Sequence, residues 1–507
     1  MKLQNIKLSP KLIDLIAFLS GCMLVFAFSP FYLSPLAFIS IAFLFLSWIK
    51  ANPKRAAWRG FLYGVGSFGV GVSWVFISIN TYGNTNIFVG GFINFAFIFA
   101  LSLFPALAGF LSTRFFKEDL ALRTAVIFPS VWVLIELLRG WAFTGFPWLL
   151  LGYTQTNTFI GGLAAIGGVY LVSLVTAFLS ALVIVFIRYP STKYRLLTII
   201  LAAIILFCAL LVYKKEWTQP LEEGAVGVTL VQGNVPQLLK WDPNEAQKIL
   251  DTYYTLTQNN MSTLVFWPEN AIPIFAQQIG PYMQAVEQLA DLHHSAILIG
   301  MPYMDNNTKA YYNSATVLGY GHGQYLKHHL VPFGEYLPLQ SLIGPVLQFM
   351  DIPMSNFSAG PLHQHLLNMD KIRVALSICY ESAFPNQIRE QSKHANLMAI
   401  ISDDAWFGNS FGPWQHLQIA QMRAIENGRY VIQSTNDGIT AIINDHGEVV
   451  KQIPQFKTMV LKGYVLFFEG STPWQRYGVS PIIMLLFLMI FIAVLDKRPF
   501  TIQRKKH

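Results

Sequence analysis

Three residues with complementary chemistry each follow a predicted β-strand in the second half of the chain. Cys379 comes at the end of the apolar run IRVALSICY, Glu269 ends STLVFWPE, and Lys327 follows GQYL where that run enters a loop. A thiol that attacks an acyl carbonyl needs a base to take its proton and a positive group to stabilise the oxyanion. Burial should raise the pKa of the Glu269 carboxyl, and the Lys327 ammonium should lower the pKa of the Cys379 thiol. These residues therefore predict nucleophilic catalysis by a thiol.

Other interpretations of the same half of the chain stay open. A free cysteine in an apolar run is often simply a core residue. GNSFG (408–412) matches the GxSxG pattern of serine hydrolases, and Asp437 and His446 follow in hydrolase order, but a loop precedes Ser410 where the pattern requires a strand. No Cys/His spacing fits a zinc site, so we expect neither a metal nor a cofactor.

The elements that must position these residues form an α/β pattern. Short β-rich runs alternate with helix-like segments at 244–259, 281–294 and 415–428, and ITAIINDHGEVV reads as a hairpin with its turn at HG. The runs are VGVTLVQG (226–233), STLVFWPE (262–269), AILIGMP (296–302), NSATVLG (313–319), IRVALSICY (372–380), LMAIISDD (397–404), YVIQSTN (430–436) and ITAIIND (439–445). Residues 214–478 are thus expected to form one α/β domain.

The rest of the chain has the composition of a membrane protein, with 53% hydrophobic and 12% charged residues overall. Most of its apolar runs reach the length needed to span a bilayer as a helix. The runs are 12–28, 33–49, 60–80, 88–113, 124–138, 158–187, 196–212 and 479–495. GVGSFG (64–69) matches a dinucleotide-binding pattern, but it lies inside one of these runs, which favours close helix packing instead.

The distribution of charge predicts the topology and excludes a nucleic-acid interface. The net charge of the whole chain is +8, but residues 214–478 contain 16 Lys and Arg against 22 Asp and Glu, a net of −6. The basic excess therefore lies in the terminal tails and alternate short loops, as expected for the cytoplasmic side of a membrane protein. We expect seven spans in residues 1–213, an extracytoplasmic domain in 214–478, and an eighth span with a basic cytoplasmic tail in 479–507.

Longer motifs carry a resemblance to a known family. WPEN, CYES and the lysine segment have the order of the Glu-Lys-Cys triad of the nitrilase superfamily. Together with VQGNVPQLLKWD (231–242), HHLVPFGEYLP, DDAWFG, TNDG (435–438) and TGFPWLLLGY (144–153), they make the whole chain resemble the apolipoprotein N-acyltransferase family. The resemblance implies a membrane helical bundle of about eight spans that carries an extracytoplasmic nitrilase-like αββα sandwich domain.

The resemblance also implies a role for each matching residue. Glu269 would be the general base, Lys327 the oxyanion stabiliser and Cys379 the nucleophile. Four supporting residues would be Glu335, which orients the lysine or relays protons, Tyr380 and Glu381, which shape the pocket, and Trp241, which faces substrate from a mobile loop. For Trp241 and Glu381, packing and a structural ion pair remain open alternatives.

The implied reaction transfers an acyl chain from a phospholipid to the N-terminal amine of a diacylated apolipoprotein. It would proceed through a thioester in a monomeric protein of the bacterial cytoplasmic (inner) membrane, with the catalytic domain on the periplasmic side. The apolar segment SLIGPVLQFMDIP (341–353) is a candidate for a lid that dips into lipid. Two alternatives are a membrane-tethered amidase, in which water resolves the thioester, and a transporter or receptor with a ligand-binding outer domain.

Overall fold

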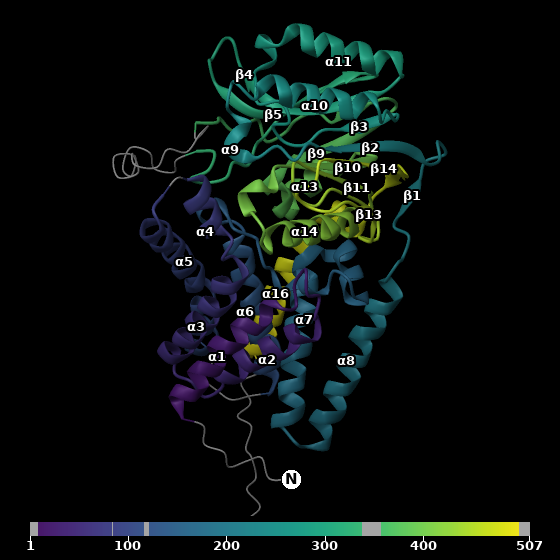
Figure 1. The fold of residues 1–507 in the computed structure, drawn as a ribbon. Helices are drawn as coiled ribbons and strands as arrows, with labels where there is room; N and C mark the ends of the chain where they lie inside the picture. Colours follow the sequence, from purple (N-terminus) through teal and green to yellow (C-terminus); the bar gives the residue numbers. More distant parts are fainter. Residues whose placement is uncertain (1–8, 84, 116–120, 337–355, 496–507) are drawn as a thin grey trace, which may run out of the picture.

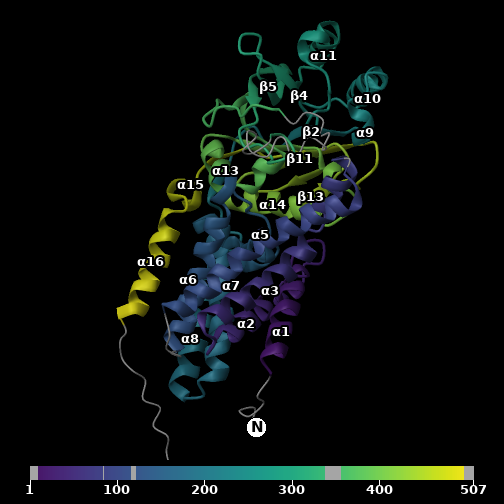
Figure 2. The same cartoon turned by 90° about the vertical axis from the view of Figure 1, so that its left-hand side faces the viewer.

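The computed structural model describes residues 9–83, 85–115, 121–336 and 356–495. A bundle of apolar helices forms one end of the molecule, and two β-sheets with their covering helices form the other (Figure 1). The chain enters the sheet domain from the end of α8 and leaves it through α15 into α16, which runs back beside α6 and α7 (Figure 2).

Each predicted apolar run forms a helix. The helices are α1 (Pro10–Val25), α2 (Pro35–Trp48), α3 (Pro53–Gly71), α4 (Val75–Ile77), α5 (Ile87–Arg114), α6 (Ala121–Arg139), α7 (Ala164–Arg188), α8 (Thr192–Val212) and α16 (Ser480–Leu495). The glycines of GVGSFG lie inside α3, where a Cβ on Gly64 would meet Ser102 Cα at 2.7 Å and one on Gly66 would meet the Phe18 carbonyl oxygen at 2.3 Å. These glycines therefore allow close approach of α3 to α1 and α5, as expected for helix packing in a membrane.

Several of the described helices are long and apolar enough to cross a membrane. Four pass by length and composition, namely α5, α6, the stretch Phe159–Arg188 that contains α7, and α8, and a fifth is added if Pro53–Gly71 and the bent continuation Val75–Tyr82 count as one span. The helices α2 and α16 are apolar but shorter. Large side chains such as Phe88, Phe92 and Phe487 are more than half exposed on the bundle surface, as expected for residues that face lipid.

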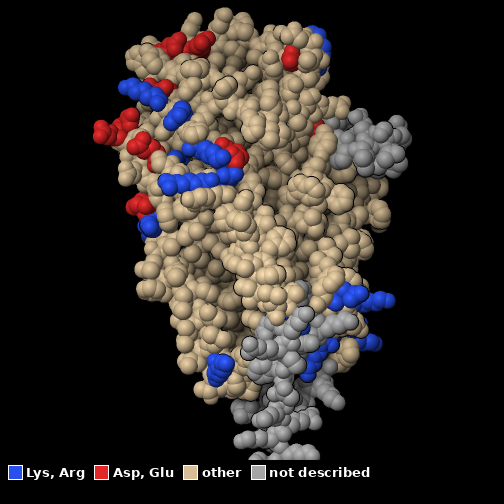
Figure 3. Space-filling model, turned by 180° about the vertical axis from the view of Figure 1, so that it is seen from behind, with Lys and Arg blue, Asp and Glu red and all other residues tan. Residues whose placement is uncertain are grey.

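One face of the molecule has few charged residues over the middle of the bundle. Figure 3 shows a broad region without Lys, Arg, Asp or Glu between the sheet domain and the far end of the helices, where basic residues reappear. The α2–α3 connection contains Lys50, and the first turns of α3 and α8 contain Lys54 and Lys193. These helix ends point away from the sheets. This distribution fits a protein whose bundle is surrounded by lipid.

Two sheets of mixed direction form the other domain. The first has the order β14-β2-β3-β4-β5-β7 and the second β13-β12-β11-β10-β9-β8-β6. Their bounds are β2 (Val226–Gln232), β3 (Leu264–Phe266), β4 (Ala296–Met304), β5 (Tyr311–Gly319), β6 (Gly321–His322), β7 (Gln324–Leu326), β8 (Leu367–Met369), β9 (Ile372–Ile378), β10 (Leu397–Ser402), β11 (Val431–Thr435), β12 (Ala441–Ile443), β13 (Val449–Gln452) and β14 (Met459–Val465). A separate pair joins β1 (Thr218–Pro220) to β15 (Phe468–Gly470). Strands β2–β3–β4 and β9–β10–β11 are parallel, and the hairpin predicted at HG is the antiparallel pair β12–β13.

Side-chain alternation places one core between the sheets and one behind each sheet. On β2, Leu230 lies in the cluster that includes Leu376 of the other sheet, whereas its neighbour Val231 packs with Leu250 of α10. The helices that cover the first sheet are α10 (Ala246–Gln258) and α11 (Gly280–Leu292), those behind the second are α13 (Pro385–Ser392) and α14 (Gly412–Asn427), and shorter helices are α9 (Gln237–Lys240) and α15 (Pro473–Tyr477). The layers therefore run helix, sheet, sheet, helix (Figure 1).

Helix α14 also fixes the sheet domain to the bundle. The Gln415 side chain accepts hydrogen bonds from the indole N–H groups of Trp74 (3.1 Å) and Trp148 (2.7 Å), and it donates to the Gly71 carbonyl (2.9 Å). These groups are buried, so leaving any of them unpaired would cost about 1–3 kcal/mol. The bundle and the sheet domain are thus held in a defined orientation.

Candidate active site

The three predicted catalytic residues lie at strand ends that meet between the sheets. Glu269 follows β3, Lys327 follows β7 directly, and Cys379 follows β9 directly. Strand β7 is antiparallel to β5 and β5 to β4, so β7 runs in the same direction as β3 and ends on the same side. The sequence prediction that these side chains share a site is supported by the contacts below.

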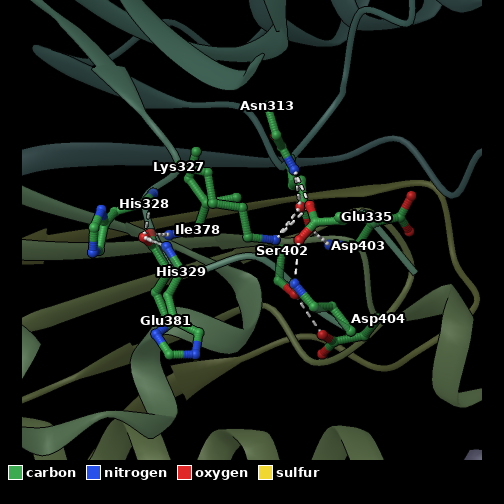
Figure 4. A network of polar contacts seen from close by, with 12 residues as sticks. Asn313, Lys327, His328, His329, Glu335, Ile378, Glu381, Ser402, Asp403 and Asp404 are labelled. Carbon is green, nitrogen blue, oxygen red and sulfur yellow. Dashed lines mark hydrogen bonds and ion pairs between the residues drawn. The ribbon is translucent and has the colours of Figure 1, made fainter. Parts of the chain in front are cut away.

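Lys327 is buried between two carboxylates (Figure 4). Its Nζ lies 3.2 Å from Glu269 Oε1 and 2.9 Å from Glu335 Oε1. The Asn313 amide bridges the same two oxygens and donates to Glu269 at 2.6 Å and to Glu335 at 2.8 Å. The Val331 N–H donates to the second Glu335 oxygen at 2.8 Å. Glu335 therefore contacts the lysine directly, and its predicted function, to orient Lys327 or to relay protons, stays a prediction.

The second oxygen of Glu269 is bound from the other sheet. The Asp403 main-chain N–H donates to Glu269 Oε2 at 2.9 Å. The Asp403 carboxylate pairs with the buried ammonium of Lys240 and accepts from the Asn436 amide at 3.2 Å. Among the described residues, each hydrogen bond to the Glu269 carboxylate comes from an N–H donor, which favours its ionised form and fixes it between the sheets.

The directions of the pKa shifts correct two expectations from the sequence. Burial alone would raise the pKa of Glu269, but the Lys327 charge and the hydrogen bonds from Asn313 and Asp403 outweigh it, and the pKa is lowered. The pKa of the Cys379 thiol is raised well above its ordinary value by burial and the Glu269 charge, which the Lys327 ammonium offsets only in part. Lys327 itself is strongly stabilised as an ammonium, because its two carboxylates outweigh the effect of burial and raise its pKa. The resting state is therefore a thiol beside a carboxylate.

The backbone at Cys379 is held in a strained conformation. Its φ is +54°, in the left-handed region that costs a residue with a Cβ roughly 1–3 kcal/mol. The strand ends at Ile378 and a 3₁₀ turn over Cys379–Ala383 begins at once, so the thiol is presented at a sharp strand-to-helix turn. Such strain is retained where the surroundings fix it, which favours a functional role over a simple core position.

Glu381 joins the cysteine turn to the lysine loop. Its carboxylate accepts from the main-chain N–H groups of Ile378 (2.8 Å), His328 (2.9 Å) and His329 (3.0 Å). It also accepts from the Tyr325 hydroxyl at 3.0 Å. The geometry gives Glu381 a structural function in ordering the two loops that carry Lys327 and Cys379.

The remaining predicted residues lie at the edges of this cluster. The Tyr380 hydroxyl donates to the Gly145 carbonyl at 2.9 Å and so touches the bundle loop TGFPWLLLGY. Trp241 is half-buried at the end of α9, next to Lys240. Ser410 accepts from the Gly412 N–H at 3.1 Å at the start of α14. Among the described residues no histidine hydrogen-bonds its hydroxyl, so the serine-hydrolase alternative gains no support. The proposed lid, residues 341–353, lies outside the described residues.

Several polar residues of the site were missed as functional candidates. Asn313 begins the predicted strand 313–319, and Asp403 lies near the end of the predicted strand 397–404; both side chains are buried. A polar residue at the end of an apolar strand was the available signal. Lys240 lies in the segment VQGNVPQLLKWD, where nothing in the sequence distinguishes a buried lysine from an exposed one. Among the described residues, one group could hold a metal ion by distance alone, Glu216 with Asp445 and His446, and it includes none of the predicted site residues.

Comparison with known proteins identifies both halves of the chain. Residues 20–182 match the apolipoprotein N-acyltransferase N-terminal domain, and residues 227–465 match the carbon–nitrogen hydrolase family. The chain is 39% identical over 484 residues to an apolipoprotein N-acyltransferase of Coxiella burnetii, which covers 95% of this chain and 100% of the relative. It is 41% identical over 495 residues to one of Azotobacter vinelandii, with 96% and 95% covered. Among solved structures, the Caenorhabditis elegans NitFhit protein aligns with 54% of this chain and 65% of its own at 17% identity and a TM-score of 0.38.

Proposed function

Because the chain belongs to the apolipoprotein N-acyltransferase family and is thus an N-acyltransferase, we propose that it acylates lipoproteins through a thioester on Cys379. The acyl donor is a membrane phospholipid. The acceptor is the α-amino group of the diacylglyceryl-modified N-terminal cysteine. The observation that carries the proposal is the buried pair of Glu269 and Lys327 at strand ends beside a strained cysteine.

In the first half-reaction, Glu269 takes the thiol proton as sulfur attacks the ester carbonyl. The proton transfer is uphill in the resting site because the pKa of the thiol is raised and that of the carboxyl lowered, so it accompanies the attack. The oxyanion forms against the Lys327 ammonium and the main-chain N–H of Tyr380. Collapse of the tetrahedral intermediate expels the lysophospholipid oxygen, which takes a proton from Glu269, and leaves the thioester.

In the second half-reaction, the acceptor amine attacks the thioester. Its ordinary pKa is near 8, so a useful fraction is free amine at neutral pH. Glu269 accepts the ammonium proton and returns a proton to the departing thiolate. Conversion of ester to thioester to amide needs neither a metal nor a nucleotide, and a shared acyl-enzyme gives ping-pong kinetics.

The proposed topology follows from the charge pattern and the fold. Residues 1–213 would supply seven spans, 214–478 a periplasmic αββα sandwich, and 479–507 an eighth span and a cytoplasmic tail in the inner membrane. The support is the basic excess at the helix ends away from the sheets and the uncharged surface between (Figure 3). We place Trp241 facing the substrate and take the protein to act as a monomer.

A discharge experiment separates acyl transfer from hydrolysis. Purified protein is first acylated with labelled phospholipid, washed, and mixed with a diacylated lipopeptide. We expect the label in an amide on the peptide, and none on a matched lipopeptide whose amino group is acetylated. Label released as free fatty acid at one rate with either peptide would instead support the amidase alternative.

A further inference from the structure

A buried chain of hydrogen bonds lies behind the nucleophile and is used by none of the steps above. The Ser402 hydroxyl, at the end of β10, donates to Asp404 Oδ1 at 2.7 Å (Figure 4). The same Asp404 oxygen lies 3.0 Å from His416 Nδ1, and His416 Nε2 lies 2.9 Å from Ser382 Oγ. Ser382 belongs to the 3₁₀ turn that begins at Cys379, so the chain runs from the end of β10 to the nucleophile's own turn.

Each member of this chain is almost completely buried. Ser402, His416 and Ser382 are fully buried, and Asp404 is 2% exposed. Buried polar groups are costly unless they are paired, so the orientation of each proton is tightly constrained. With Nδ1 protonated, His416 donates to Asp404 and accepts from the Ser382 hydroxyl, which satisfies both ring nitrogens.

The Ser402 hydroxyl has two acceptors and one proton. It also lies beside the cysteine turn, because β9 and β10 are parallel with Ile378 opposite Ile401, so Cys379 and Ser402 are the next residues on the two neighbouring strands. A hydrogen bond from Ser402 would lower the pKa of the Cys379 thiol. While sulfur carries its proton, the hydroxyl can donate to Asp404 and accept from the thiol. When sulfur is a thiolate, it can only accept, and the hydroxyl is the neutral group placed between it and the Asp404 carboxylate.

We propose that Ser402 is a further catalytic residue, which turns its hydroxyl from Asp404 to Cys379 Sγ and hydrogen-bonds the thiolate as it forms. The thiol proton goes to Glu269, and the Ser402 proton stays on its own oxygen throughout. His416 keeps its hydrogen bond to Asp404 when the hydroxyl turns away, so the carboxylate is never left without a donor. Asp404 and His416 act through Ser402 and are positioning residues.

The chain also ties the nucleophile to the helix bundle. His416 follows Gln415 on α14, and Gln415 is held by the indoles of Trp74 and Trp148. The orientation of the imidazole that supports Ser402 is therefore fixed from the bundle side. This inference rests on Cys379 being the nucleophile, but it concerns the ionisation of the thiol and not the identity of donor or acceptor.

The test is the pH profile of Cys379 alkylation by iodoacetamide in full-length protein, read from the Cys379 peptide by mass spectrometry without acyl donor or acceptor. The charged groups that act on the thiol are Glu269, Lys327 and Asp404. Substitution of Ser402 leaves all three in place. A hydrogen bond to an ionised group shifts an ionisation by about one unit or more. We expect Ser402→Ala to move the profile about one unit to higher pH and to slow alkylation roughly tenfold at pH 8.

Three further variants make the outcome decisive. Ser402→Thr keeps a hydroxyl and should restore most of the rate, whereas Ser434→Ala removes a buried serine hydroxyl from the neighbouring strand, bonded to the Phe266 carbonyl, and should leave the profile unchanged. Asp404→Asn removes the opposing charge and should move the profile to lower pH. A Ser402→Ala profile that coincides with that of the native protein, or a Thr variant as slow as the Ala variant, would overturn the proposal.

Discussion

Lys327→Met is the substitution that most directly tests the electrostatics of the site. Methionine has a similar length but no charge, so Glu269 and Glu335 would lose the ammonium that lies 3.2 and 2.9 Å from them. Removing one partner of a buried ion pair costs about 3–5 kcal/mol of stability. Because two carboxylates lose their partner here, we expect the free energy of unfolding to fall by about 5 kcal/mol at pH 7. For a domain of this size that lowers the melting temperature by at least about 10 °C.

The loss of stability in Lys327→Met should depend on pH, and the direction of that dependence tests the charge state of Glu269. In the native protein the pKa of Glu269 is lowered, so its contribution to stability is present above the ordinary carboxyl pKa and lost as pH falls through the folded value. Without Lys327, burial dominates and raises the pKa of Glu269, so protonation relieves the folded variant as pH falls. Thermal unfolding from pH 7 to pH 5 should therefore show the deficit shrinking.

The control for this experiment is Lys457→Met on an exposed lysine between β13 and β14, which should melt within about 1 °C of the native protein. Equal melting temperatures for Lys327→Met and the native protein at pH 7, or a deficit that stays constant down to pH 5, would refute this account of the site.

Three further outcomes follow from the contacts. First-turnover acylation should be nearly flat from pH 8 to about pH 5, because the pKa of Glu269 is lowered and that of Cys379 raised, and the thiol–carboxylate form dominates between them; a tenfold rise per pH unit would contradict this. Tyr380→Phe should cost about 1 kcal/mol of stability in thermal unfolding and change first-turnover acylation less than threefold, since only the bond to Gly145 is lost; a hundredfold slower acylation would place its hydroxyl in the reaction. Glu381→Gln should lower the free energy of unfolding, measured by denaturant titration, by about 2 kcal/mol, because an amide N–H would face a main-chain donor; unchanged stability would argue against its function in joining the loops.

Much of the fold was predictable because its elements are local in sequence. Apolar run length located the helices, and alternating β-rich runs located the strands that carry Glu269, Lys327 and Cys379. The number of spans was less predictable, since some runs form helices shorter than a bilayer requires or bend within one crossing.

The electrostatic state of the site was not predictable from the sequence. The expectation of a raised pKa for Glu269 was wrong, because the Lys327 charge and the hydrogen bonds from Asn313 and the Asp403 N–H, all distant in sequence, outweigh the effect of burial. The positive φ of Cys379 likewise follows from how the turn after β9 is held by Glu381, a contact that spacing alone does not reveal.

The central claim, that Cys379 carries the acyl chain, is tested by trapping the acyl-enzyme. Purified protein is incubated with phospholipid labelled in its acyl chains, denatured, and treated with hydroxylamine, which cleaves thioesters. We expect one hydroxylamine-sensitive label on the native protein and on Ser410→Ala, and none on Cys379→Ala. Label retained on Cys379→Ala, or lost in Ser410→Ala, would contradict the thioester mechanism.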